Sequence, residues 1–316
     1  MEVKLKEGKT YHIKELTLET ISDLTSLFND TKKIPETTSY FTKKYLTNYL
    51  NLTFCNYLLY DGTIAIGFSG VTFNELENSH TRIVVGQLGD VLVHPNYRGL
   101  GIQSVLLKLA AETCKLNNID GLLALPNSQA EPIFAYNSDW TIFNSFYIYT
   151  FPVKTFPILK FLNKFNLSKY YMAFFQFIND SNYAKYKIWK SNLPNNDLFY
   201  PVRSVAFFDY KKYKQHTISK TQGVKFIWSL DDGIVIGDWE HSVGLSTVEV
   251  LTKIKRFAKL RGIHSFRFVT TKNNYWYDEL CKVQEPVKSL NIYFRCFNSE
   301  VNLHHLCFNS FDRNAY

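Results

Sequence analysis

A strand, a turn with two glycines and a helix follow one another without a break between residues 88 and 117. The turn reads His-Pro-Asn-Tyr-Arg-Gly-Leu-Gly, and apolar residues then recur at helical spacing. The first N–H groups of a helix have no partner within it, and the helix dipole adds positive charge, so this end can bind an anion. Gly99 and Gly101 carry no Cβ, so a phosphate can approach the backbone, and Arg98 adds a charge at the rim. The segment therefore predicts a cradle for a pyrophosphate.

Three kinds of phosphate-binding loop combine a turn of this type with a helix. A Walker loop requires Gly-Lys-Ser/Thr and a dinucleotide fingerprint requires three glycines, and this turn has neither. The segment resembles the third kind, the coenzyme A loop of the GNAT acyltransferases, which reads Gln/Arg-x-x-Gly-x-Gly/Ala after a strand ending in Val-x-Pro. Residues 96–101 keep this spacing, with Asn96 at the Gln/Arg position and His94-Pro95 before it.

The resemblance to GNAT acyltransferases implies acetyl-CoA, or another acyl-CoA, as co-substrate and no metal. It places the thioester and the pantetheine arm along the strand backbone and the phosphates over the turn. It also places an Asn near the coenzyme at a strand exit such as Leu125-Pro126-Asn127. The expected coenzyme-binding residues are Leu92, Val93, Arg98, Gly99, Leu100, Gly101, Ile102, Gln103 and Asn127.

Acyl transfer to an amine needs one group that takes the amine's proton and one that protonates the departing thiolate. Asp90 lies on the strand that leads into the turn, where the family often presents a carboxylate, and Leu88 and Leu92 share its face if the strand alternates. The alternative for Asp90 is a polar residue that holds the strand end or a bulge. Tyr136 is the candidate acid, although the family's spacing to an aromatic residue at Trp140 puts this Tyr one position earlier.

The rest of the chain reads as alternating strands and helices. In the first half we expect a helix at 15–30, a hairpin at 56–73, one strand or two at 83–93, a helix at 101–117, and strands at 121–125 and 141–151. In the second half we expect strands at 233–241, 264–271 and 287–296, and helices at 245–261 and 275–283. A shift of about 144 residues aligns the two halves, which favours an internal duplication over a chance match of two α/β units.

The duplication predicts an α/β (α+β) architecture, a GNAT fold with a mixed central sheet followed by a second, degenerate GNAT-like lobe. We expect an acyl-CoA-binding catalytic domain at 1–152, a helical and aromatic connecting segment at 153–223, and the degenerate domain at 224–316. Only Ser242-Val243-Gly244 follows the matching strand, so no coenzyme is expected there. The segment Tyr40–Tyr45 and the chain length resemble two-lobed GNAT proteins found with bacterial surface-polysaccharide genes.

Four further polar residues are weaker candidates. His94 stands before the proline of the turn, where a loop residue that faces away from the thioester is the favoured interpretation. Asp238, Glu240 and His241 cluster at the end of the second half's strand and could bind an acceptor. Surface residues at a strand end are the favoured interpretation for these three.

Composition and charge exclude several other classes of function. Apolar residues make up 46% and charged residues 20%, as in globular proteins. The net charge is +8, but the lysines form no run of five, which argues against a nucleic-acid partner and favours a solvated surface. Five cysteines without a C-x-x-C pair argue against a zinc site. With neither a signal-peptide core nor 18 consecutive apolar residues, we expect a cytoplasmic protein without a transmembrane segment.

These features predict an acyl-CoA-dependent N-acyltransferase, with acetyl as the expected acyl group and a small amine as acceptor. A nucleotide-linked amino sugar for surface polysaccharide is the preferred acceptor, because sugar rings stack on aromatic residues and a diphosphate suits a positive surface. One alternative is a tandem-GNAT aminoacyl transferase for a cell-wall precursor, although such proteins usually lack an intact coenzyme loop. Another is a non-enzymatic basic binding protein for RNA or a membrane surface.

Overall fold

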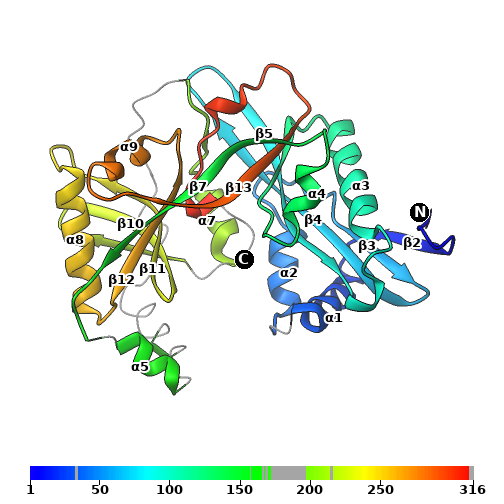
Figure 1. The fold of residues 1–316 in the computed structure, drawn as a ribbon, viewed down its shortest axis with the longest axis horizontal. Coiled ribbons are helices and arrows are strands. Elements are labelled where there is room, and N and C mark those ends of the chain that lie inside the picture. Colours follow the sequence, from blue (N-terminus) through cyan, green and yellow to red (C-terminus); the bar gives the residue numbers. More distant parts are fainter. Residues whose placement is uncertain are drawn as a thin grey trace.

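The computed structural model describes residues 1–32, 35–156, 158–165, 167, 170–171, 197–213 and 216–312. In this part of the chain thirteen strands form one mixed sheet, and two lobes lie side by side along it (Figure 1). The strands follow the order β1-β2-β3-β4-β5-β6-β13-β7-β12-β11-β10-β9, and β8 pairs with β4.

The first lobe is built from the N-terminal elements. Its strands are β1 (Glu2–Lys4), β2 (Thr10–Glu15), β3 (Tyr57–Asp61), β4 (Ile64–Glu77), β5 (Arg82–Val93), β6 (Gly121–Ala124) and β7 (Thr141–Pro152). Its helices are α1 (Ile21–Lys32), α2 (Thr38–Tyr45), η1 (Pro95–Tyr97), α3 (Ile102–Leu116) and α4 (Glu131–Ala135).

The connecting segment and the second lobe contain the remaining elements. The strands are β8 (Tyr200–Pro201), β9 (Thr217–Thr221), β10 (Val224–Asp231), β11 (Gly233–His241), β12 (Ser265–Thr271) and β13 (Val287–Cys296). The helices are α5 (Ile158–Lys164), α7 (Val205–Tyr210), η3 (Lys211–Tyr213), α8 (Thr247–Leu260), α9 (Tyr275–Cys281), η4 (Leu303–His305) and η5 (Ser310–Asp312).

Helices cover both faces of the first lobe's sheet. Because neighbouring residues of a strand point to opposite faces, Leu58 packs with α1 and α2 in one apolar cluster, whereas Leu59 packs with α3 in another. The helix α3 buries one stripe of its surface, from Ile102 through Leu106 to Cys114, as the apolar spacing predicts. The parallel strands β5 and β6 are joined through this helix, and α3 therefore starts at the carboxyl end of β5.

The second lobe repeats the central unit of the first. β10 and β11 form a hairpin, the helix α8 follows, and β12 then pairs in parallel with β11. In the first lobe β4 and β5 form the hairpin, α3 follows, and β6 pairs in parallel with β5. Each hairpin contains a bulge at a Gly-Asp pair, Gly89-Asp90 on β5 and Gly237-Asp238 on β11. The shared topology and the matching bulges confirm a second lobe that is built like the first.

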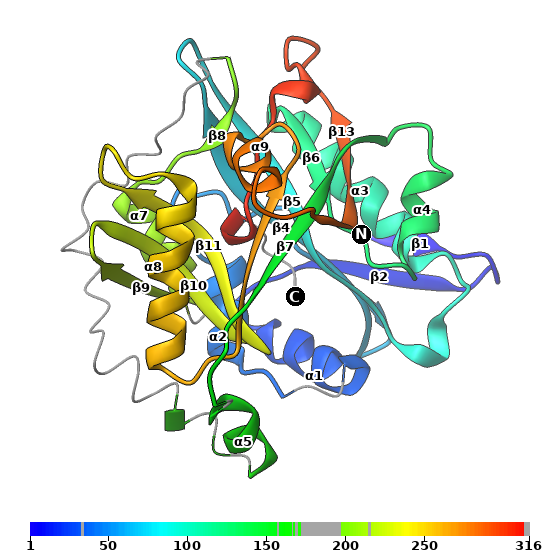
Figure 2. The ribbon, with the colours of Figure 1, turned by 60° about the vertical axis from the view of Figure 1, so that its left-hand side comes forward.

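The last strand of each half pairs with the other half. β13 hydrogen-bonds to β6 of the first lobe, and β7 hydrogen-bonds to β12 of the second. β7 and β13 also pair with each other and cross the middle of the molecule (Figure 2). The domain boundaries 1–152, 153–223 and 224–316 stay a prediction. Because each half supplies a strand to the other's sheet, we expect the two halves to fold together.

Most of the expected elements are confirmed, several of them to the residue. The strand expected at 233–241 is β11, and the strand expected near 287–296 is β13. The range 83–93 forms one strand, β5. The helix expected at 15–30 begins only at Ile21, because residues 10–15 form β2 and alternate between exposed and buried side chains.

The connecting segment is described only in part. Its described residues form the helices α5 and α7 and the strands β8 and β9, whereas residues 172–196 lie outside the described residues, so the helical, aromatic segment stays a prediction. Among the residues that are described, no helix has the length and apolarity needed to cross a membrane.

Candidate active site

A pocket of about 750 Å³ opens where β5 and β6 separate. The two strands pair only over Val85–Gln87 and Gly121–Leu123, and the bulge at Gly89-Asp90 follows directly on β5. The pocket brings together residues from both strand ends and from the start of α3. Of the predicted site residues, those that line it are Asp90, Leu92, Val93, Arg98, Gly99, Gly101, Ile102, Gln103 and Asn127.

Two predicted residues do not line this pocket. Leu100 packs against the apolar cluster between α3 and β2. Tyr136 is the C-cap of α4 and its side chain is 91% exposed. Trp140 packs edge-on against Phe134, with ring centroids 4.9 Å apart, and thus anchors this stretch without bringing Tyr136 to the pocket.

The turn before α3 presents unpaired backbone donors to the pocket. Gly99 and Gly101 have φ angles of +85° and +87°, a left-handed conformation that strains residues with a Cβ. Gly101 is the N-cap of α3 and makes no side-chain cap, so the first N–H groups of the helix stay available to a ligand. His94 accepts a hydrogen bond from the Asn96 N–H at 3.3 Å and so stabilises the turn. These features fit the diphosphate of an acyl-CoA.

Lys6 adds a positive charge to this cradle. A Cβ built on Gly101 would lie 3.7 Å from Lys6 Cε, so the lysine side chain passes directly beside the helix start. Lys6 and Arg98 both line the pocket. Lys6 escaped the sequence analysis because it follows β1, about ninety-five residues before the turn, and only the folded sheet brings the two together.

Asp90, which also lines the pocket, is held in a buried ion pair. Its side chain is 7% exposed, and its Oδ2 accepts hydrogen bonds from Lys44 Nζ and Tyr45 Oη, each at 2.7 Å. The Asp90 N–H donates to the same Tyr45 oxygen at 2.9 Å. Tyr45 therefore closes the bulge, and Lys44 neutralises the carboxylate. Asp90 thus sits at a bulge, as one interpretation expects, and it also lines the pocket, while its catalytic role stays a prediction.

Burial and neighbouring charge set the ionisation states of Lys44 and Tyr45. Burial is the largest single influence and lowers the pKa of Lys44, but the charges and hydrogen bonds of Asp90 and Tyr40 together outweigh it, so its pKa lies above the usual value and the ammonium stays charged. Burial raises the pKa of Tyr45 well above its usual value, so the phenol remains a donor. A Cβ on Gly70 would lie 2.5 Å from the Tyr45 ring, which explains the glycine opposite the bulge.

The sequence contained only an indirect signal for these partners of Asp90. Lys44 and Tyr45 end the segment Tyr40–Tyr45, which was singled out for its resemblance to two-lobed proteins. Nothing in the local pattern relates Lys44 to Asp90, which are 46 residues apart in the sequence. A buried lysine is rare without a partner, and the structure supplies the partner through tertiary packing.

The polar residues of the second lobe do not line the pocket. Arg203 Nη2 lies 3.3 Å from the Asp238 carboxylate, whereas Lys225 pairs with Glu240. The His241 ring packs against Trp276, with ring centroids 5.7 Å apart. The prediction of a surface residue is wrong for Asp238, which is only 6% exposed. Its burial is compensated by the buried guanidinium, which no local pattern could reveal.

Asp238 predicts a pH dependence of stability. Burial raises its pKa to about 6, although Arg203 opposes this shift. An unfolded aspartate titrates near a pKa of about 3.9. The native state therefore binds the proton more tightly, and the free energy of unfolding falls as the pH rises from about 4 to about 6, by about 2–3 kcal/mol.

Urea denaturation of the wild type and of Asp238→Asn across pH 4–7 measures this effect. We expect the wild type to lose stability through that window relative to the variant, which has no proton to release. Parallel pH profiles for the two proteins would contradict the assignment.

The described residues contain no group of three or more His, Cys, Asp or Glu side chains that could hold a metal ion. The charged side chains among the described residues that line the pocket are Lys6, Lys32, Arg98 and the Asp90 carboxylate, which Lys44 pairs, and the N–H groups at the start of α3 add further donors. This donor set suits a phosphate-bearing ligand.

Comparison with known proteins agrees with the geometry of the first lobe. The sequence model of the acetyltransferase (GNAT) family matches residues 21–135. No curated protein matches the chain in sequence. A conserved protein from Enterococcus faecalis V583 superposes with a TM-score of 0.59 at 13% identity, covering 92% of this chain and 73% of that protein.

Two further solved structures share the fold over both lobes. A GCN5-related N-acetyltransferase from Kribbella flavida has a TM-score of 0.55 at 10% identity, with 92% of this chain and 72% of that chain covered. One from Anabaena variabilis has a TM-score of 0.55 at 12% identity, with 91% and 73% covered. The family match over residues 21–135 thus identifies the part of the chain that carries the coenzyme loop as a GNAT acetyltransferase domain, a family whose members use acetyl-CoA as co-substrate.

Proposed function

We propose that this chain transfers an acyl group, with acetyl as the first choice, from acyl-CoA to the amine of a small acceptor that carries phosphate. A nucleotide-linked amino sugar for surface polysaccharide is the preferred acceptor. One observation carries the proposal. Among the described residues that line the pocket, the cations are Lys6, Lys32 and Arg98, whereas the carboxylate is Asp90, which Lys44 already neutralises.

The cations lie at two sides of the pocket. Lys6 and Arg98 flank the turn before α3, where we place the diphosphate of the coenzyme. Lys32 is the last residue of α1, and the same helix contributes Phe28 and Thr31 to the lining of the pocket. A second anionic group, on the acceptor, would suit Lys32. A polycationic acceptor would be repelled by the same lining.

The coenzyme contacts are proposed for the residues expected from the sequence. The backbone of Leu92 and Val93 holds the thioester and the pantetheine arm, and Asn127 borders them at the end of β6. The turn and the start of α3 hold the phosphates through Arg98, Gly99, Leu100, Gly101, Ile102 and Gln103. Support comes from the lining of the pocket and from the available N–H groups of α3.

The reaction needs two proton transfers. The neutral amine attacks the thioester carbonyl carbon, and its proton passes to Asp90 directly or through one water. The C–S bond then breaks, and the leaving thiolate takes a proton, which we assign to Tyr136. Since Tyr136 is exposed outside the pocket, this role requires the stretch after α4 to move toward the coenzyme. The cations of the lining favour the neutral, reactive form of the amine.

Lys32 should set the preference for an acceptor that carries phosphate. We expect Lys32→Ala to raise the KM of such an acceptor about tenfold, the loss expected for one charge-assisted hydrogen bond. The kcat and the KM of acetyl-CoA should not change. Lys115→Ala, an equally exposed lysine in the last turn of α3, is the matched control. An unchanged acceptor KM in Lys32→Ala would remove Lys32 from the acceptor site.

An acceptor screen tests the proposed function. Release of the coenzyme A thiol is followed with nucleotide-linked amino sugars, the free amino sugars and polyamines at matched concentrations. We expect the nucleotide-linked sugars to be acetylated with the highest kcat/KM. Faster turnover of polyamines would contradict the proposed acceptor class. Transfer from aminoacyl-tRNA without acetyl-CoA would support the aminoacyl transferase alternative instead.

A further inference from the structure

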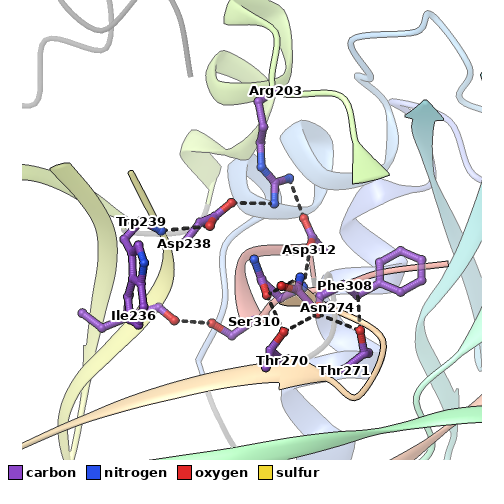
Figure 3. Close-up of polar contacts among 11 residues, drawn as sticks. Arg203, Ile236, Asp238, Trp239, Thr270, Thr271, Asn274, Phe308, Ser310 and Asp312 are labelled. Atoms are coloured by element: carbon purple, nitrogen blue, oxygen red, sulfur yellow. Dashed lines mark hydrogen bonds and ion pairs between the residues drawn. The ribbon is translucent and has the colours of Figure 1, made fainter. Parts of the chain in front are cut away.

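The chain's own C-terminal residues fill the cleft of the second lobe. β11 and β12 pair only over Ile234–Ile236 and Phe266–Phe268, as β5 and β6 do around the active pocket. Residues 306–312, here called the C-terminal segment, lie where β11 and β12 separate (Figure 3). Ser310 Oγ donates to the Ile236 carbonyl at 2.8 Å, and the Thr271 N–H donates to the Phe308 carbonyl at 3.1 Å.

The C-terminal segment completes a buried ionic cluster. Asp312 lies 2.5 Å from Arg203 Nη1, while Asp238, at the bulge of β11, lies 3.3 Å from Arg203 Nη2 (Figure 3). The Arg203 side chain is only 5% exposed. One guanidinium thus joins the second lobe's strand to the C-terminal segment. Its planar fork suits two carboxylates, which the point charge of a lysine does not.

The helix α7, which begins just after Arg203, connects this ionic cluster to the first lobe. Ser204, the next residue, caps α7 by accepting a hydrogen bond from the Phe207 N–H at 3.0 Å. Phe207 packs with Phe311 of the C-terminal segment on one side and with Tyr49 of the first lobe on the other. The helix α7 therefore lies between the two lobes and touches both.

The last residue of α7 reaches the helix that holds the active-site carboxylate. Tyr210 Oη donates a hydrogen bond to the Lys44 carbonyl at 2.8 Å, and both groups are buried. In η3, Tyr213 packs against Tyr40 of α2, with ring centroids 5.8 Å apart. The backbone of the last turn of α2 is thus tied to α7, while the side chains of the same turn hold Asp90.

We propose that Arg203 is a positioning residue for acyl transfer, which acts from the second lobe through α7 on the Lys44–Asp90 pair. The inference rests on the proposed function of Asp90. The inference gives the second lobe a role in acyl transfer. Its cleft is closed by the C-terminal segment and takes no coenzyme, and it instead anchors α7, which supports α2 beside the active-site pocket. A displacement of α2 would move Lys44 and Tyr45 together, and small displacements of a catalytic group are costly for turnover.

The coupling can be measured without an acceptor. Amide hydrogen exchange of α2 and α3 is compared in the wild type, Arg203→Met, Arg203→Lys and Tyr210→Phe. We expect exchange in α2 to rise about tenfold in Arg203→Met and Tyr210→Phe, because one tertiary hydrogen bond or its anchor is lost. Exchange in α3 should stay unchanged, whereas general destabilisation would raise exchange in both helices. Arg203→Lys should fall between the wild type and Arg203→Met.

Turnover provides the second readout. We expect Tyr210→Phe to lower kcat about tenfold while the Kd of acetyl-CoA stays within a factor of two. Arg267→Met, which breaks the Arg267–Asp231 pair elsewhere in the second lobe, is the control and should keep the wild-type kcat. Should Arg203→Met fail to fold because two buried carboxylates lose their partner, Tyr210→Phe decides the question.

Different results would contradict the proposed acyltransferase function and the positioning role of Arg203. A wild-type protein that binds acetyl-CoA but acetylates no acceptor overturns the proposed function. An active wild type whose Tyr210→Phe variant keeps both its kcat and slow exchange in α2 overturns only the role of Arg203. Equal loss of kcat and coenzyme affinity in Tyr210→Phe also overturns it, since the defect would then not be confined to α2.

Discussion

Gly101→Glu is expected to abolish the binding of acetyl-CoA. Gly101 has a φ of +87° and is the N-cap of α3, so any side chain there strains the turn that shapes the cradle. The new carboxylate would also stand beside Lys6 and the first N–H groups of the helix, where the anion should bind. The carboxylate would itself occupy the anion site at the helix start and would repel the diphosphate of acetyl-CoA. Steric and electrostatic effects therefore act in the same direction.

The thermal midpoint of unfolding measures this loss. Acetyl-CoA at a hundred times its Kd should raise the Tm of the wild type by about 5 °C and that of Gly101→Glu not at all. Gly244→Glu is the control, because Gly244 has a φ of +91°, open space around it and a place in the turn before α8, two residues ahead of its N-cap Ser246. A normal Tm shift in Gly101→Glu would show that the coenzyme loop lies elsewhere.

Asp90→Asn is expected to lower kcat by about two orders of magnitude, since it removes the proposed proton acceptor. The Kd of acetyl-CoA should change little, because we place the phosphates of the coenzyme at the turn before α3 and not at Asp90. The variant also leaves Lys44 buried without its carboxylate, which should cost about 3–5 kcal/mol of stability. The effect of the substitution on proton transfer must therefore be separated from its effect on the stability of the fold.

The double variant Lys44→Met/Asp90→Asn separates them. It removes both buried charges and keeps similar side-chain volumes, so we expect it to recover most of the stability lost in Asp90→Asn. Its kcat should remain as low as that of the single variant. Recovery of turnover together with stability would reduce Asp90 to a structural residue of the bulge.

The coenzyme loop could be predicted from the sequence because it is contiguous. Its strand end, its turn and its helix start all lie within residues 88–104, so local rules for glycine and helix termini suffice. The strands β11 and β13 were predicted for a similar reason, since their apolar runs are bounded by clear breaks.

The partners of these elements could not be predicted. An apolar run indicates a strand but not its neighbour, and so the exchange of β7 and β13 between the lobes was invisible. Lys6, Lys44 and Arg203 meet their partners across tens of residues, and each would otherwise read as a solvated surface charge. The strand β2 was not predicted, because only Tyr11 and Ile13 mark its buried face.

The stoichiometry of acetyl-CoA binding tests the central claim most directly. Calorimetric titration of the full chain should give one site per chain, because the turn before α3 is open while the C-terminal segment closes the second lobe's cleft. Two sites per chain would contradict the closed second lobe. No binding would contradict the assignment of the pocket itself, and with it the function proposed for this chain.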